Sequence, residues 1–265
     1  MFDAYSRAIT YLRVSVTDRC NLKCTYCMPA EGIATSPRAA ILSLEEIENV
    51  VAFGARLGIR KVRLTGGEPL VRRGIVTLVK KLADINGISD MAMTTNGQLL
   101  GQYADPLIRA GLQRLNISLD TLDAGAYAQI TRGGNLSHVL EGIDAAVRAG
   151  FTGIKLNCVV TESPREPHAQ SVAAYGQDKG FDVRYIRRMN TETGEFWPVM
   201  GGEGGNCDRC NRLRLSSAGV IFPCLFSDES FSVRQLGIEN AFKMALQHKP
   251  ECGLKSGHRF YQIGG

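Results

Sequence analysis

The chain has 265 residues, a formal net charge of +5 and 44% hydrophobic residues, which suffices for one large domain or a large domain with a small appendage. No stretch approaches the ~18 uninterrupted apolar residues of a membrane span, and residues 1–15 lack the apolar centre of a secretory leader. We therefore expect a cytoplasmic protein with no membrane partner.

The lysines and arginines are spread along the chain and do not form one basic run. This distribution gives little support to nucleic-acid binding, so we expect no nucleic-acid partner. A modest positive charge of this kind suits a small anionic substrate equally well.

Segments rich in β-branched residues alternate with helical segments, and this alternation predicts a parallel sheet. The predicted strands are Thr10–Thr17, Lys61–Thr65, Met91–Thr95, Arg114–Leu119, Gly153–Val160 and Phe181–Ile186. Between them, Ser43 and Glu46 have the spacing of a capping box for a helix over Leu44–Leu57. A second helix is predicted over Ser137–Ala149, where the apolar positions share one face.

Periodicity alone does not distinguish a doubly wound sheet from a barrel. However, each group of unusual residues follows the carboxyl end of a predicted strand, which is where parallel β/α barrels build their sites. These groups are Cys20–Cys27, Gly66–Pro69, Thr95–Gly97 and Ser118–Asp120. We therefore predict an α/β fold, a partial (β/α)6 TIM-like barrel over residues 1–190.

The β/α pattern ends after Ile186. A glycine-rich stretch, Gly201–Gly205, leads into a second group of cysteines, and a short hairpin and a helix from about Val233 to Gln247 are expected to follow. We predict that residues 191–265 form a small C-terminal domain.

The chain contains eight cysteines, and a reducing compartment argues against disulfides, so metal or cluster ligation is the leading interpretation. Cys20, Cys24 and Cys27 place three thiols on one predicted loop. Three thiolates hold three irons of a [4Fe–4S] cubane and leave the fourth iron without a protein ligand. The alternative is a zinc knuckle, which normally needs four ligands, and no fourth Cys or His lies nearby in the sequence.

A second triad consists of Cys207, Cys210 and Cys224. Its spacing allows a second [4Fe–4S] cluster, again with an open iron, or a zinc ribbon completed by Cys252. Cys158 lies on a predicted strand and is expected in the core, because free cysteine is often buried.

The first triad, with an aromatic residue before its last cysteine, resembles the radical S-adenosylmethionine (SAM) superfamily. The resemblance implies that the open iron binds SAM and that a low-potential electron cleaves it to a 5′-deoxyadenosyl radical. It also implies an electron donor such as ferredoxin or flavodoxin. The residues implied to contact SAM are Tyr26, Gly67, Glu68, Thr95, Asn96, Ser118 and Asn157. Without the resemblance, Asn96 and Ser118 would be read as strand-end caps.

A broader set of segments resembles the GTP 3′,8-cyclase family of molybdenum cofactor biosynthesis. The segments are Leu12–Cys20, Lys61–Leu70, Thr94–Gly97, Asn116–Asp120, Thr131–Gly134, Cys210–Leu215, Lys249–Pro250 and Gly264–Gly265. In that family the open iron of the second cluster binds guanine. The radical then takes a ribose hydrogen, and the sugar carbon attacks the purine.

The resemblance also implies a set of basic residues that bind the substrate triphosphate, for which forked guanidinium donors are suited. These residues are Arg13, Lys61, Arg63, Lys155, Arg184, Arg212 and Arg214. Considered singly, each is equally consistent with a solvated surface charge. The terminal Gly264 and Gly265 are implied to enter the barrel mouth and to help position Arg13 for catalysis.

The sequence departs from the family pattern on the substrate side. The connector Asn190–Asn206 is shorter than is usual, and Arg187 stands where the family typically has Glu. Trp197 in this connector is expected to have a packing role, and the alternative is that it stacks on a base. The substrate is thus GTP or, alternatively, another nucleotide or a peptide. A non-catalytic cluster or zinc module is a third alternative, which production of 5′-deoxyadenosine would exclude.

Overall fold

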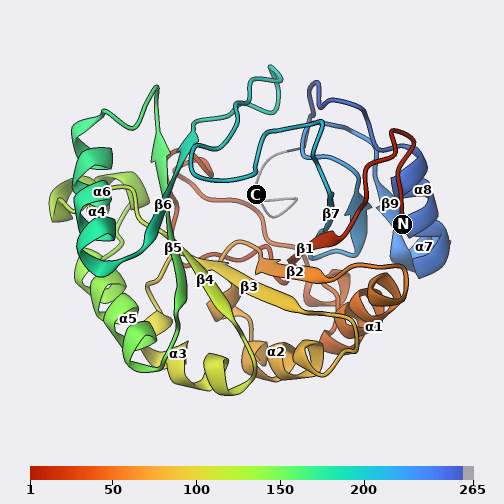
Figure 1. Cartoon of the computed structure of the whole chain (residues 1–265), viewed down its shortest axis with the longest axis horizontal. Coiled ribbons are helices and arrows are strands. Elements are labelled where there is room, and N and C mark those ends of the chain that lie inside the picture. Colours follow the sequence, from red (N-terminus) through yellow and green to blue (C-terminus); the bar gives the residue numbers. More distant parts are fainter. Residues whose placement is uncertain (259–265) are drawn as a thin grey trace.

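The computed structural model describes residues 1–258, which are built around one curved sheet (Figure 1). Its strands are β1 (Tyr11–Ser15), β2 (Lys61–Thr65), β3 (Asp90–Thr95), β4 (Arg114–Ser118), β5 (Gly153–Val160), β6 (Asp182–Arg187), β7 (Arg212–Leu215), β8 (Val220–Phe222) and β9 (Phe231–Ser232). Their spatial order is β6-β5-β4-β3-β2-β1-β7-β8-β9. Strands β1 to β7 run parallel to one another, whereas β8 is antiparallel to β7 and β9 is antiparallel to β8.

Helices lie along the outer, convex side of the parallel strands (Figure 1). They are α1 (Leu44–Arg56), α2 (Ile75–Ala83), α3 (Leu100–Arg109), α4 (Ala124–Thr131), α5 (Leu136–Arg148) and α6 (Pro167–Lys179), with short 3-10 turns at Arg38–Ala40 and Pro69–Val71. A curved parallel sheet with its helices outside is a partial β/α barrel. The fold class predicted from the sequence is therefore confirmed.

The local signals for the first helix are found in the structure. Ser43 Oγ accepts a hydrogen bond from the Glu46 backbone N–H at 3.1 Å, and Glu46 Oε2 accepts one from the Ser43 N–H at 2.7 Å.

The single helix predicted over Val233–Gln247 is wrong. Gly237 has a φ of 76° and divides it into α7 (Val233–Leu236) and α8 (Ile238–Gln247), because a residue with positive φ does not continue a right-handed helix.

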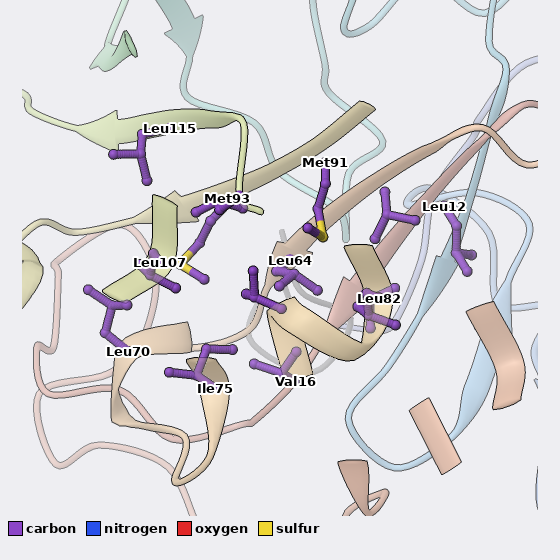
Figure 2. Packing of buried hydrophobic residues seen from close by; sticks show 14 of the residues in the cluster. Leu12, Val16, Leu64, Leu70, Ile75, Leu82, Met91, Met93, Leu107 and Leu115 are labelled. Atoms are coloured by element: carbon purple, nitrogen blue, oxygen red, sulfur yellow. The ribbon is translucent and has the colours of Figure 1, made fainter. Parts of the chain in front are cut away.

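Apolar side chains fill the layer between the sheet and the outer helices. Figure 2 shows Leu64 and Met93 from the strands facing Ile75 of α2 and Leu107 of α3, and all four are at most 1% exposed. On β5, buried and partly exposed residues alternate strictly, so Cys158 packs in this layer, as predicted, and is fully buried. The alternation leaves the concave face of the sheet for polar residues.

The described C-terminal part continues the same sheet. Strand β7 pairs in parallel register with β1, and the expected hairpin is formed by β7 and β8. This pairing places the second cysteine triad near the amino ends of β1 and β7, at the opposite end of these strands from the loop that follows β1. The boundary at residue 190 stays a prediction. None of the helices within residues 1–258 is long and apolar enough to cross a membrane.

Candidate functional site

The concave side of the sheet encloses a cavity of about 400 Å³, a size typical of small-molecule sites. Strand ends, the connector from β6 to β7 and the segment after β8 form its wall. The predicted site residues that line it are Arg13, Cys20, Cys24, Tyr26, Cys27, Lys61, Arg63, Gly67, Glu68, Thr95, Asn96, Ser118, Asn157, Arg184, Cys207, Cys210, Arg212, Arg214 and Cys224. The fold thus gathers residues from both cysteine groups around one space.

The first triad lies on the loop that follows β1. Burial raises the pKa of the Cys20 thiol to about 11 and that of Cys24 to about 12, and it raises the pKa of Cys27 as well. The three thiols are therefore protonated in the metal-free protein and must lose their protons when they bind metal. Arg132 supports the loop, since its guanidinium donates to the carbonyl of Met28 at 2.8 Å.

Gly67 lies in the turn after β2 and packs directly against the cysteine loop. A Cβ at this position would lie 2.2 Å from the Arg19 carbonyl oxygen, too close for any side chain. The adjacent Glu68 N–H donates to the same oxygen at 2.8 Å. Glycine is thus required here for the close approach of two backbones.

Glu68 is 1% exposed and its carboxylate is held by three donors. The backbone N–H groups of Leu70 and Asn96 donate at 2.9 and 2.7 Å, and Thr95 Oγ1 donates at 2.8 Å. Burial nevertheless raises the pKa of Glu68 to about 7. Asn96, which donates to Glu68 through its backbone, also places its side-chain Nδ2 3.8 Å from Cys20 Sγ. The carboxylate of Glu68 is therefore held one residue away from the first triad.

Three other predicted SAM residues also line the cavity: Tyr26 from the triad loop, Ser118 from the end of β4 and Asn157 from β5. The Tyr26 hydroxyl donates to Asp120 Oδ2 at 2.8 Å. Ser118 and Asn157 are paired in register on β4 and β5. Together with Thr95 they give the cavity wall a row of hydrogen-bonding groups.

A row of arginines crosses three adjacent strands. The register aligns Arg214 of β7, Arg13 of β1 and Arg63 of β2. Burial and the charge of Arg214 lower the pKa of Arg13, and burial and the charge of Arg212 lower the pKa of Arg214 to about 10. Like charges directly opposite one another destabilise a sheet, so this row indicates a site for an anion with several charges.

One of the predicted substrate residues lies away from the cavity. Lys155 does not line the cavity. It sits near the amino end of β5 and pairs with Asp182 of β6, whereas Asn157 and Val159, further along the same face, do reach the cavity. The prediction that Lys155 binds substrate is not supported by its position. Gly264 and Gly265 lie outside the described residues.

The second triad is accompanied by a buried lysine that sequence reasoning did not assign a role. Lys249 is 3% exposed, and its ammonium donates to Cys210 Sγ at 3.4 Å and to the Pro223 carbonyl at 2.7 Å. Burial alone would raise the pKa of Cys210, but the charges of Lys249 and Arg212 bring it down to about 7. The lysine therefore favours the thiolate that a metal needs. The burial of Lys249 beside Cys210 is what indicates this role, and only the structure shows that burial.

The fourth cysteine near this triad is Cys252, whose Sγ lies 3.2 Å from Cys207 Sγ. Cys252 is exposed and does not line the cavity. Within residues 1–258, no three Cys, His, Asp or Glu side chains converge to hold a single metal ion. A zinc ribbon requires such convergence, whereas each thiolate of a cubane binds a different iron.

Comparison with known proteins agrees with this geometry. The family model of the radical SAM superfamily matches residues 14–164. A GTP 3′,8-cyclase from Alkaliphilus oremlandii is 39% identical over 299 positions, covering 95% of this chain and 93% of that protein. A GTP 3′,8-cyclase from Pelotomaculum thermopropionicum is 40% identical, covering 88% and 86%. The chain belongs to the GTP 3′,8-cyclase family of radical SAM enzymes.

Membership of the radical SAM superfamily implies one [4Fe–4S] cluster and SAM, and the first triad with Glu68 fits them. A solved structure of native anSMEcpe with bound AdoMet has a TM-score of 0.64 at 16% identity, over 90% of this chain and 81% of that one, which supports the barrel fold. The 299 aligned positions exceed the 265 residues present here. The Alkaliphilus cyclase therefore has residues that this family member lacks.

Proposed function

We propose that this chain is a GTP 3′,8-cyclase, which uses SAM to convert GTP into (8S)-3′,8-cyclo-7,8-dihydroguanosine 5′-triphosphate. The observation that carries the proposal is that two cysteine triads and an aligned row of arginines face one cavity. The triads suit two iron–sulfur clusters, and the arginines suit a triphosphate.

On the SAM side of the cavity, Cys20, Cys24 and Cys27 hold the first cluster. When bound, the cluster and SAM supply the 5′-deoxyadenosyl radical. Glu68 accepts the SAM ammonium group, because its carboxylate is fixed by three donors and lies beside the triad. Thr95, Asn96, Ser118, Asn157, Gly67 and Tyr26 complete the SAM site.

On the substrate side, Cys207, Cys210 and Cys224 hold a second [4Fe–4S] cluster whose open iron takes the guanine. Arg13, Lys61, Arg63, Arg184, Arg212 and Arg214 bind the triphosphate, and Arg13 also contacts the reacting sugar. The aligned guanidinium groups would release their mutual repulsion when the triphosphate binds. Gly264 and Gly265 position Arg13 in this proposal.

The same proposal covers the setting of the reaction. It includes the division into residues 1–190 and 191–265, a ferredoxin or flavodoxin as electron donor, and the cytoplasm as compartment. The eight cysteines support the compartment, because thiols intended for clusters must stay reduced.

The test is turnover by anaerobically reconstituted protein with SAM, a reductant and a panel of nucleotides, with products identified by mass spectrometry. We expect 5′-deoxyadenosine to form, and we expect GTP to be the only nucleotide of the panel that gives a cyclised product. Replacing Cys20, Cys24 and Cys27 with Ala should abolish both products, whereas replacing Cys207, Cys210 and Cys224 should leave uncoupled 5′-deoxyadenosine formation. Cys158→Ala is the control, because Cys158 lies in the core.

A second candidate is a related enzyme with two clusters that acts on another nucleotide or on a peptide. Two facts favour it. Residues Gly202 to Asn206 of the connector line the cavity, and the chain is shorter than the Alkaliphilus cyclase with which it aligns. Cyclisation of a different nucleotide in the panel would select this candidate, and absence of 5′-deoxyadenosine would exclude both.

A further inference from the structure

The end of β6 and the connector that follows it meet in one side-chain contact at the cavity. The guanidinium carbon of Arg187 lies 3.8 Å from the centre of the Trp197 ring. Arg187 lines the cavity, and Trp197 supports it from the connector. Trp197 is also the only tryptophan of the chain. The packing role expected for Trp197 thus has a specific partner.

The backbone of the connector fixes Trp197 beside β6. Met200 and Tyr185 exchange two backbone hydrogen bonds, at 3.0 and 3.1 Å, so the connector returns antiparallel to the strand. On the other side of Trp197, Asn190 and Glu195 exchange two more, at 2.9 and 3.0 Å. Trp197 is therefore held between two paired segments.

A glycine closes the same arrangement. Gly205 has a φ of 77°, and a Cβ there would lie 2.2 Å from the Trp197 carbonyl oxygen. The glycine-rich stretch is thus folded tightly against the backbone of Trp197. The position of the indole ring follows from the backbone of the whole connector and is not that of a freely rotating surface side chain.

Among the residues that the structure describes, none accepts a hydrogen bond from the Arg187 side chain. Its Nε is buried without a hydrogen-bond partner, and within residues 1–258 its guanidinium makes no ion pair with a carboxylate. Stacking on an indole ring contacts the flat face of the guanidinium and leaves the N–H groups, which lie in its plane, available. A buried donor without a partner costs free energy, so these groups call for an acceptor supplied by a ligand.

We propose that Arg187 binds the phosphate chain of the substrate and that Trp197 is the residue that positions it. This inference rests on the proposed function, in which the cavity takes a nucleoside triphosphate. Arg187 adds to the aligned arginines a cation that approaches from β6. Because the stacked guanidinium is already oriented, little side-chain freedom is lost when an anion binds.

The experiment measures binding of inorganic triphosphate, and separately of GTP, by calorimetry on the reconstituted protein without turnover. Arg187→Met should weaken triphosphate binding by about tenfold or more, as expected for the loss of a charge-assisted contact. The triphosphate affinity of Arg187→Lys should lie between those of the parent and of Arg187→Met, because an ammonium keeps the charge but lacks the forked N–H donors of a guanidinium. Trp197→Leu should weaken binding by roughly threefold to tenfold through loss of positioning.

The matched control is Arg56→Met. The Arg56 guanidinium also lies over an aromatic ring, that of Phe53 at 5.1 Å, but it is exposed on α1 and does not line the cavity. Its loss should leave triphosphate binding unchanged. Thermal unfolding of each variant shows that the chain remains folded under the binding conditions.

The single tryptophan gives an independent readout. Triphosphate should change the emission of Trp197 in the parent, because the cation over the ring gains an anionic partner, and the change should be lost in Arg187→Met. Parental triphosphate affinity in Arg187→Met would overturn the inference while leaving the proposed function intact. Failure of the parent protein to bind either triphosphate or GTP would overturn both.

Discussion

Cys252 Sγ lies 3.2 Å from Cys207 Sγ, outside the cavity that Cys207 lines. Two thiols at this separation need only a small displacement to form a disulfide. A disulfide would leave Cys207 without a thiolate, so Cys207 could no longer bind metal in the second triad. In a reducing compartment the thiols stay free, so the pair is harmless unless an oxidant is present.

We predict that cluster-free protein treated with glutathione disulfide contains a Cys207–Cys252 bond. Thiol–disulfide exchange forms this bond and releases two molecules of reduced glutathione for each one formed. Peptide mapping without reduction should find the linked pair, and Cys252→Ser should abolish it and restore loading of the second cluster without added reductant. Cys158→Ser should have no effect. Recovery of a Cys207–Cys210 bond in place of the predicted one would contradict this expectation.

Gly67→Ala should disable the SAM side while leaving the substrate side intact. The added Cβ would meet the backbone of Arg19, and backbone cannot move aside as a flexible side chain can. We expect a loss of about 1–3 kcal/mol in stability from overpacking and little SAM binding, but normal binding of triphosphate. Gly101→Ala is the control, because a Cβ at Gly101 meets nothing within 4 Å. Normal 5′-deoxyadenosine formation by Gly67→Ala would count against the proposed turn.

The sequence was sufficient to predict the six parallel strands and both triads, because β-branched runs and cysteine spacing are local signals. It did not predict the environment of each side chain. Lys155 has the charge expected of a substrate contact, but it pairs with Asp182 and does not line the cavity. Lys249 and Arg187 acquire their roles from partners far along the chain or in an irregular connector. No periodicity reports such pairings, since they depend on how the strands are ordered.

SAM affinity should rise with pH through about pH 7, the value to which burial raises the pKa of Glu68. Below that pH the folded protein holds Glu68 protonated and neutral, and above it Glu68 is charged. The SAM ammonium favours the charged form, so affinity increases as the proton leaves. Calorimetry at several pH values should show this dependence, and Glu68→Gln should remove it together with about tenfold or more of affinity. A pH-independent affinity in the parent would place the ammonium elsewhere.

Arg7 ties the second triad to the amino-terminal segment, a role that its sequence position does not indicate. Its guanidinium donates to the carbonyl oxygens of Cys207, Pro250 and Glu251 at 2.7, 2.6 and 2.7 Å, and it pairs with Asp3 at 2.7 Å. One side chain therefore holds Cys207, the first residue of the triad, and the segment that carries Cys252.

Arg7→Met should loosen both segments, because three carbonyls lose a charged donor, each at a cost of about 1–3 kcal/mol where it stays away from water. We expect the second cluster to release iron to a chelator several times faster than in the parent, while the first cluster and 5′-deoxyadenosine formation without substrate stay unchanged. Chelator kinetics followed by the visible absorbance of the clusters should then show two separate phases. Arg7→Lys should give an intermediate rate, since an ammonium keeps the charge but cannot reach three carbonyls in the same fixed geometry. Equal acceleration of both phases would mean that Arg7 stabilises the whole barrel and has no particular role at the second triad.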